Sequence, residues 1–191
     1  MIANLALDRD VFTSNVFLVT GERTALVDVG NEFDVVEAVE AHVDDLDVVV
    51  LTHTHYDHVA NLESVLDAFD VDVVAFDGDA EGVTQVLGDG ESVQIGDHEY
   101  VAIHTPGHKN DHLCLYSEDP GVLFAGDLVF AGGSFGRTDL DEGDRPTLIE
   151  SIQRVLDVVD EALHEMHTGH GPSVESNPYQ TIQMAHQAAQ F

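Results

Sequence analysis

The sequence predicts a layered α/β fold with helices on the outside, and three observations support this. Segments with strand periodicity alternate with segments of helical periodicity in both halves of the chain. The runs at 47–52 and 71–76 are rich in valine along their length, which is typical of strands buried on both faces. No repeat or Pro/Ser-rich linker divides the 191 residues, so we expect a single domain over 1–191.

The N-terminal half predicts a hairpin followed by alternating helices and strands. Gly21 lies in a polar turn between two apolar runs, which indicates the hairpin. Phe33, Val36 and Val39 recur as they would on one face of a helix. The expected elements are hairpin strands at 15–19 and 24–29, helices at 33–43 and 59–69, and strands at 47–52 and 71–76.

The C-terminal half predicts shorter strands and two helices. Gly-Asp turns interrupt short strands from about residue 83 to 105. Pro146 is well placed for the first turn of a helix, and a glycine-rich loop precedes a short terminal helix. The expected elements are strands at 112–116 and 122–125, a helix at 146–159, a loop at 168–172 and a helix from about Tyr179.

The charge balance is strongly acidic. The chain has 37 acidic and 6 basic residues, giving a net charge of −31, and Lys109 is its only lysine. This charge argues against nucleic acid as a partner, because phosphates require a basic footprint. The near-absence of lysine along the whole chain favours adaptation to molar salt, where self-repulsion is screened. The alternative interpretation is a well-solvated acidic surface.

Composition also predicts a cytoplasmic protein. The single cysteine, Cys114, excludes an internal disulfide framework. No apolar run approaches the roughly 20 residues that span a bilayer, so no membrane partner is expected. The first ten residues are acidic and lack the basic flank of a secretory signal. We expect a small-molecule substrate, while the oligomeric state is left open.

A dense group of metal-binding residue types follows the first buried strand. His53, His55, Asp57 and His58 lie within six residues, in a loop at the strand's end. Alternate residues of an extended loop point the same way, so His53 and His55 can face one ion. After a turn, Asp57 and His58 can face a second. The segment therefore predicts a metal site.

Three further residues end strands or turns in the same manner. His108 follows a Thr-Pro-Gly turn, Asp127 follows the apolar strand at 122–125, and His170 lies in the glycine-rich loop. Each is a weak signal alone, because a histidine after glycine is usually a loop residue. Together, and in this order, they are a strong signal.

At this point the chain resembles the metallo-β-lactamase fold superfamily over nearly its whole length. The resemblance implies an αββα sandwich with the site at one edge of the paired sheets. It implies that His53, His55 and His108 hold one metal ion and that Asp57, His58 and His170 hold a second. Asp127 would bridge the two ions. All seven positions are present without substitution.

The ligand types then predict a hydrolase with two divalent metal ions. Imidazole and carboxylate suit zinc, iron or manganese, of which zinc is our first expectation. Two such ions can share a water and lower its pKa toward neutrality, which supplies a bridging hydroxide as the nucleophile. Asp57, besides acting as a ligand, is the expected catalytic residue that orients this nucleophile.

Two local features resemble short, single-domain glyoxalase II-like hydrolases. His112 follows His108 in the segment PGHKNDHLCLY, and a Gly-Arg-Thr-Asp segment occupies 136–139. The resemblance implies hydrolysis of a thioester of a 2-hydroxy acid and a low-molecular-weight thiol. Full-length glyoxalase II has a C-terminal helical region that binds glutathione, and the chain continues only briefly after His170. Another thiol carrier is therefore an alternative to glutathione.

Two other activities of this superfamily stay open. A persulfide dioxygenase would need a single iron on His53, His108 and Asp127, and it usually carries a smaller residue where His112 stands. A lactonase would act on a cyclic ester. A nuclease is disfavoured by charge, and a non-enzymatic binding module by the intact ligand set.

Several polar residues around the ligands have two interpretations each. Asp28 resembles the family's buried aspartate that braces the ligand loop. His104 can donate to a ligand or carboxylate, while His167 is expected to end the segment before the loop and not to bind metal. Arg137 either pairs with Asp139 or Asp144, or contacts substrate. Tyr56 either lines the site or packs. The histidines expected on the surface are His42, His98, His164 and His186.

Overall fold

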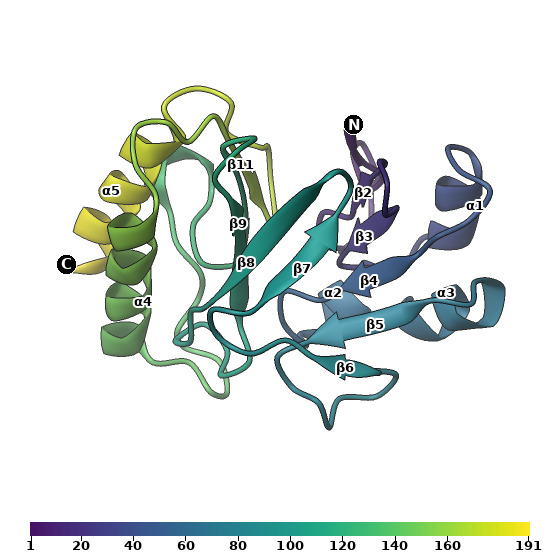
Figure 1. Ribbon diagram of the computed structural model, residues 1–191. Coiled ribbons are helices and arrows are strands. Elements are labelled where there is room, and N and C mark those ends of the chain that lie inside the picture. Colours follow the sequence, from purple (N-terminus) through teal and green to yellow (C-terminus); the bar gives the residue numbers. More distant parts are fainter.

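The computed structural model describes all residues from Met1 to Phe191 and has four layers (Figure 1). Two β-sheets face each other, and helices cover the outer face of each. This is the αββα arrangement that the resemblance implied, so the predicted fold class is confirmed. None of the helices combines the length and apolar character that crossing a bilayer requires.

The first sheet has six strands in the order β1-β2-β3-β4-β5-β6. β1, β2 and β3 pair antiparallel, which confirms the predicted hairpin, whereas β3 to β6 run parallel. β4 consists of three buried valines, as burial on both faces requires. The strands are β1 (Ile2–Asn4), β2 (Phe17–Val19), β3 (Ala25–Val27), β4 (Val48–Val50), β5 (Asp72–Ala75) and β6 (Gln85–Val86).

The second sheet has five strands in the order β11-β10-β9-β8-β7. Only β10 and β11 pair in parallel, and the other pairs are antiparallel. The strands are β7 (Ser92–Ile95), β8 (His98–His104), β9 (Leu113–Ser117), β10 (Val122–Gly126) and β11 (Glu165–Thr168).

The hydrophobic core is divided into three clusters, one at each boundary between layers. One lies between the first sheet and its helices, one between the sheets, and one between the second sheet and its helices. Alternating β2 residues show the division, since Leu18 faces the first cluster and Phe17 the second. The helices are α1 (Val35–Glu40), α2 (Tyr56–Val59), α3 (Leu62–Ala68), α4 (Arg145–Val158) and α5 (Pro178–Ala189), with a short 3-10 helix at Ala131–Gly133.

The helices of the first half are shorter than predicted. Asp34 caps α1 by accepting a hydrogen bond from the Glu37 N–H at 2.9 Å. This cap fixes the start of α1 at Val35, two residues later than expected. Of the helix expected at 59–69, only Leu62–Ala68 is helical, as α3. A separate one-turn helix, α2, precedes it at Tyr56–Val59, inside the segment that we expected to be a loop. The His58 carbonyl accepts from the N–H groups of Val29 and Gly30, at 2.9 and 3.1 Å, instead of continuing the helix. Asn61 donates to the Val29 carbonyl at 3.0 Å and holds the break.

The short strands expected between residues 83 and 105 belong to different sheets. β6 pairs with β5 at the edge of the first sheet, while β7 and β8 form a hairpin in the second. Both residues of β6 are exposed. The chain therefore crosses from one sheet to the other through the turn between β6 and β7.

Candidate metal centre

The seven predicted ligands follow the ends of four strands, and the structure brings them together. His53 to His58 follow β4, His108 follows β8, Asp127 follows β10 and His170 follows β11. These ends lie at one edge of the sandwich, where loop residues from both sheets meet. Ligand atoms of all seven side chains fall into three overlapping groups whose members lie within 4.8 Å of one another.

The first group contains three imidazoles. His55 Nδ1 lies 3.0 Å from His53 Nε2 and 2.9 Å from His108 Nε2. The other ring nitrogens of His108 and His53 are already engaged. His108 Nδ1 bonds to the Arg137 carbonyl at 2.8 Å, and His53 Nδ1 lies 3.1 Å from Thr52 Oγ1. The three remaining nitrogens can therefore offer their lone pairs to one cation.

The second group joins the short helix α2 to the loop after β11. Asp57, His58 and His170 contribute one ligand atom each. His170 Nε2 lies 3.0 Å from Asp57 Oδ2. The His170 side chain is 33% exposed, whereas that of His58 is fully buried, so the group opens to solvent on the His170 side.

Asp127 lies between the two groups and contacts both. Its Oδ2 is 3.4 Å from His108 Nε2 and 3.5 Å from His170 Nε2. Its Oδ1 is 3.4 Å from His58 Nε2. These spacings are those of neighbouring ligand atoms around a metal ion, and they are too long for strong hydrogen bonds.

Of the five buried side-chain atoms that lack a hydrogen-bond partner, two belong to predicted ligands. They are His58 Nε2 and Asp127 Oδ1. Leaving such an atom unsatisfied costs roughly 1–3 kcal/mol, so a cation beside them relieves a real penalty. The donor set therefore fits divalent metal ions. Its imidazole and carboxylate ligands suit zinc, iron or manganese. Cys114 is buried elsewhere, and burial raises its pKa to about 12, so it is no ligand.

The charges of the site favour a cation in the same place. Burial acts to lower the pKa of His58, but Asp28 and Asp127 overcome it and raise that pKa to about 10. Burial acts to raise the pKa of Asp127, and His58 holds it well below its usual range instead. Burial lowers the pKa of His53, which keeps its imidazole neutral. The carboxylates of Asp28 and Asp127 thus favour a positive charge between them, which either a proton on His58 or a metal ion can supply.

Asp28 braces the ligand loop, as its family resemblance implied. It accepts hydrogen bonds from Thr52 N and Thr52 Oγ1, both at 2.8 Å, and contacts His58 Nδ1 at 2.7 Å. The contact with Nδ1 leaves His58 Nε2 directed toward Asp127. Asp28 therefore fixes both the loop and the ring orientation of one ligand.

His112 has a role that sequence analysis did not assign. It is fully buried, and its Nδ1 lies 2.7 Å from Thr105 Oγ1. Its Nε2 accepts the backbone N–H of Asp127 at 3.0 Å. Burial lowers the pKa of His112 to about 3, which maintains the neutral ring that this acceptor role requires. His112 thus positions the backbone of the residue that contacts both ligand groups.

Asn15 is a second residue that sequence analysis missed. Its backbone N–H donates to the Gly169 carbonyl at 2.7 Å, and its side chain donates to the carbonyls of Thr168 and Gly171 at 2.7 and 2.8 Å. It thereby fastens the His170 loop to the N-terminal half. Gly169 leaves room for the carboxylate, since a Cβ there would meet Asp127 Oδ1. No local motif marks a partner so distant in sequence.

The structure also places the other polar residues that sequence analysis considered. His104 bonds to the Asn110 carbonyl at 2.7 Å and stacks on Phe76, so it contacts no ligand. Arg137 makes a two-bond pair with Asp139, at 2.9 and 2.8 Å, and both side chains are exposed. Tyr56 is 72% exposed and therefore does not pack in the core. His167 lies inside β11 and is not among the ligand groups.

The chain is similar in sequence to a known protein of stated activity. Hydroxyacylglutathione hydrolase from Klebsiella pneumoniae subsp. pneumoniae is 35% identical over 157 residues. The match covers 80% of this chain and 61% of that protein, so the chain spans less than two thirds of its relative's length.

Solved structures share the fold. TTHA1623, crystallised in a di-iron-bound form, is 26% identical with a TM-score of 0.73, covering 92% of this chain and 94% of that one. ETHE1 from Myxococcus xanthus is 20% identical with a TM-score of 0.78, covering 100% of this chain and 90% of that one. The likeness to ETHE1 shows the fold alone. A family model described as the metallo-beta-lactamase superfamily matches residues 9–177. The chain, with its αββα layers and the ligand groups at their edge, belongs to the metallo-beta-lactamase superfamily.

Proposed function

We propose that this chain is a metal-dependent hydrolase that cleaves a thioester of a 2-hydroxy acid and a low-molecular-weight thiol. The observation that carries the proposal is the set of seven converging ligands with two buried, unpaired ligand atoms. The 35% identity to hydroxyacylglutathione hydrolase supports the thioester as substrate. The whole set of ligands supports two metal ions, with zinc as the first candidate. The di-iron form of TTHA1623 makes iron the next to test.

We assign three ligands to each of two cations, with a seventh shared between them. His53, His55 and His108 would hold the first ion, and Asp57, His58 and His170 the second. Asp127, whose carboxylate lies beside ligands of both groups, would be shared between the two ions. Bound there, the metal pair supplies an acidified water and a Lewis acid for the thioester carbonyl.

Asp57 is the residue that we assign to orient the attacking water. Burial raises the pKa of Asp57, but the hydrogen bond from His170 and the charge of His58 outweigh it, so the pKa stays below its usual value. The carboxylate is therefore ionised at neutral pH and can accept a hydrogen bond from water. A thiolate leaves readily without a general acid, so no further proton donor is required.

The site has an aromatic rim on the side from which substrate can enter. Phe12 is 70% exposed and stacks on His170, with ring centroids 6.4 Å apart. Phe130 lies 6.2 Å from the same ring. Arg137 is already paired with Asp139, and we therefore assign the contact with the acyl or thiol group to Phe12 and Phe130.

The deciding experiment combines metal analysis with a substrate screen. Protein purified in high salt without chelator is analysed for zinc, iron and manganese, and then assayed with 2-hydroxyacyl thioesters of several small thiols. Two metal equivalents with thioester turnover support the proposal. A single iron with oxygen uptake on a persulfide would replace it with a dioxygenase using His53, His108 and Asp127. Turnover of lactones alone would replace it with a lactonase.

Substitution of the shared ligand tests the arrangement directly. Asp127→Ala removes the one carboxylate that contacts both groups, so we expect metal content to fall below two equivalents and kcat/KM to fall more than about 100-fold. His55→Ala should also abolish turnover. His186→Ala, on the half-buried side of α5, is the matched control and should retain activity. Full activity in Asp127→Ala would refute the shared-ligand role.

A further inference from the structure

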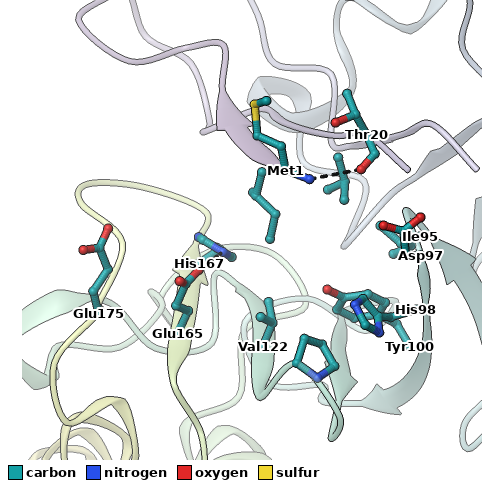
Figure 2. A pocket seen from close by; sticks show the side chains of 13 residues that line it. Met1, Thr20, Ile95, Asp97, His98, Tyr100, Val122, Glu165, His167 and Glu175 are labelled. Carbon is teal, nitrogen blue, oxygen red and sulfur yellow. Dashed lines mark hydrogen bonds and ion pairs between the residues drawn. The ribbon is translucent and has the colours of Figure 1, made fainter. Parts of the chain in front are cut away.

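A cavity lies at the opposite edge of the sandwich from the metal centre. The metal ligands follow the C-terminal ends of β8, β10 and β11, whereas this cavity is lined by residues at their beginnings, Tyr100, Val122 and Glu165 (Figure 2). It has a volume of about 460 Å³. No residue of the seven-ligand set contributes to it. The cavity is therefore separate from the proposed active site.

His167 borders this cavity and has an unexplained nitrogen. The residue is 6% exposed and lies between the rings of Phe17 and Phe124, at 4.9 and 5.1 Å. Its Nδ1 lies 2.9 Å from Ser173 Oγ, while its buried Nε2 has no hydrogen-bond partner. An unpaired polar atom in an apolar layer costs roughly 1–3 kcal/mol. A bound group that reaches Nε2 would remove this cost.

One carboxylate lies beside the same nitrogen, and two more line the cavity. Glu165 Oε2 lies 3.4 Å from His167 Nε2, and Glu175 and Asp97 also line the cavity (Figure 2). No lysine or arginine lines it. The one cation at the rim is the amino group of Met1, which donates to the Thr20 carbonyl at 3.1 Å. The excess of carboxylates favours a positively charged ligand.

The size and the apolar walls favour an organic ion over a bare metal ion. The side chains of Ile2, Ile95 and Val122 contribute apolar surface, and Tyr100 adds an aromatic ring. A volume of about 460 Å³ falls within the roughly 300–1,000 Å³ of small-molecule sites. Only two ligand atoms, one from His167 and one from Glu165, have the spacing that a metal ion needs.

We propose that this cavity binds a small organic ammonium ion. Its N–H groups donate to His167 Nε2 and to the Glu165 carboxylate, and its apolar part lies against Tyr100 and Val122. The His167 ring then carries its hydrogen on Nδ1 and donates it to Ser173 Oγ. Burial holds the pKa of His167 at about 4, so the ring is neutral and Nε2 can accept.

The test uses the metal-loaded protein and three probes of similar shape but different charge. 2-Phenylethylammonium, 2-phenylethanol and 3-phenylpropionate are titrated in an amine-free phosphate buffer. Affinities are taken from the NMR signals of the probe in every variant, and the ring signals of His167 are followed as well wherever His167 is retained. We expect a saturable shift with the ammonium probe alone. Glu165→Gln and His167→Phe should each weaken binding at least about tenfold. Glu150→Gln removes an equal charge on the exposed face of α4 and should leave the affinity unchanged.

Three outcomes would overturn the proposal. In the first, no probe moves the His167 signals. In the second, Zn²⁺ added beyond the metal-loaded state moves them while the ammonium probe does not, which would assign a metal site. In the third, Glu150→Gln weakens binding as much as Glu165→Gln does, which would reduce the effect to the general negative charge of the surface. Because Glu165 is partly exposed, Glu165→Gln keeps the test decisive even if His167→Phe alters folding.

Discussion

Asp28 shows how much of the metal centre depends on a residue that binds no metal. It adopts a left-handed backbone, with φ of 57°, and accepts hydrogen bonds from the backbone N–H and the hydroxyl group of Thr52. Aspartate and asparagine are the non-glycine residues that tolerate this conformation best. An amide at this position would keep the backbone but lose one acceptor oxygen.

We therefore expect Asp28→Asn to fold and to bind metal about 10–100-fold more weakly, the usual cost of losing a group that orients a ligand. Competition with a chelator of known affinity measures the change. Asp8→Asn is the matched control, because Asp8 also has a left-handed backbone, with φ of 62°, but its side chain is exposed. Equal affinity in both variants would show that Asp28 does not support the site.

His167 makes the stability of the protein sensitive to acid. Burial lowers its pKa to about 4, against roughly 6.5 for an unfolded histidine. Below pH 6.5, His167 binds a proton in the unfolded chain but stays neutral in the folded chain. The free energy of unfolding therefore decreases as the pH falls toward 4. The loss from this residue approaches ~3 kcal/mol. Between pH 7.5 and 4.5, denaturant unfolding of His167→Phe should lose less stability than the wild type, and His186→Phe should match the wild type.

At the residue scale, sequence analysis found seven residues that the structure brings together, but it missed residues that hold them in place. Each ligand follows a strand or a turn in a short motif, and all seven converge. His112 was noted for its position in a motif, but its bond to the Asp127 N–H depends on how β9 and β10 pair. Asn15 bonds to carbonyls more than 150 residues away. Such contacts exist only once the fold has formed.

At the scale of elements, α4 packs closely against the His108 turn. Gly107 has φ of 119°, and a Cβ there would meet the backbone N and Cα of Leu148 at the start of α4. The Asp144 N–H donates to the Gly107 carbonyl at 2.8 Å, and Asp144 also caps α4. The position of His108 thus depends on the first turn of α4.

Gly107→Ala should lower the free energy of unfolding by more than ~2 kcal/mol and weaken metal binding, because the added methyl group separates the turn from α4. Denaturant unfolding and chelator competition measure the two effects. Gly90→Ala provides the reference, since Gly90 also has positive φ, of 78°, but faces open space. It should cost about 1 kcal/mol with no change in metal affinity. Equal costs in the two variants would exclude the close approach as the cause.

Elements with continuous apolar character were predicted correctly, whereas those defined by pairing were not. β4 and β5 are buried and valine-rich, and each lies within its predicted range. β6 is two exposed residues that become a strand only because β5 is beside them. The division between α2 and α3 arises from hydrogen bonds to the Val29–Gly30 loop, which helical periodicity cannot reveal.

At the scale of the whole molecule, the unbalanced charge dominates. Four basic residues, Arg23, Lys109, Arg137 and Arg154, form ion pairs, and they leave most of the 37 acids without a partner. Mutual repulsion among the acids opposes folding at low ionic strength. Adaptation to molar salt remains our prediction from this charge.

We expect the thermal unfolding midpoint to rise with KCl, most steeply between about 0.15 and 1 M, where the Debye length falls from roughly 8 to 3 Å. Differential scanning calorimetry over a KCl series measures the effect. Sucrose at equal osmolality stabilises without screening and should not reproduce the steep rise. A midpoint independent of KCl would refute the prediction.

The fastening of the His170 loop by Asn15 has a consequence for protein synthesis. A growing chain on the ribosome carries His53 to His58 early, whereas His170 and the carbonyls that Asn15 binds emerge much later. At about 5–20 residues per second, the interval is on the order of ten seconds. During that time the chain offers only an incomplete set of the proposed ligands. We therefore expect stable metal binding to begin only after the His170 loop has emerged and Asn15 has fastened it.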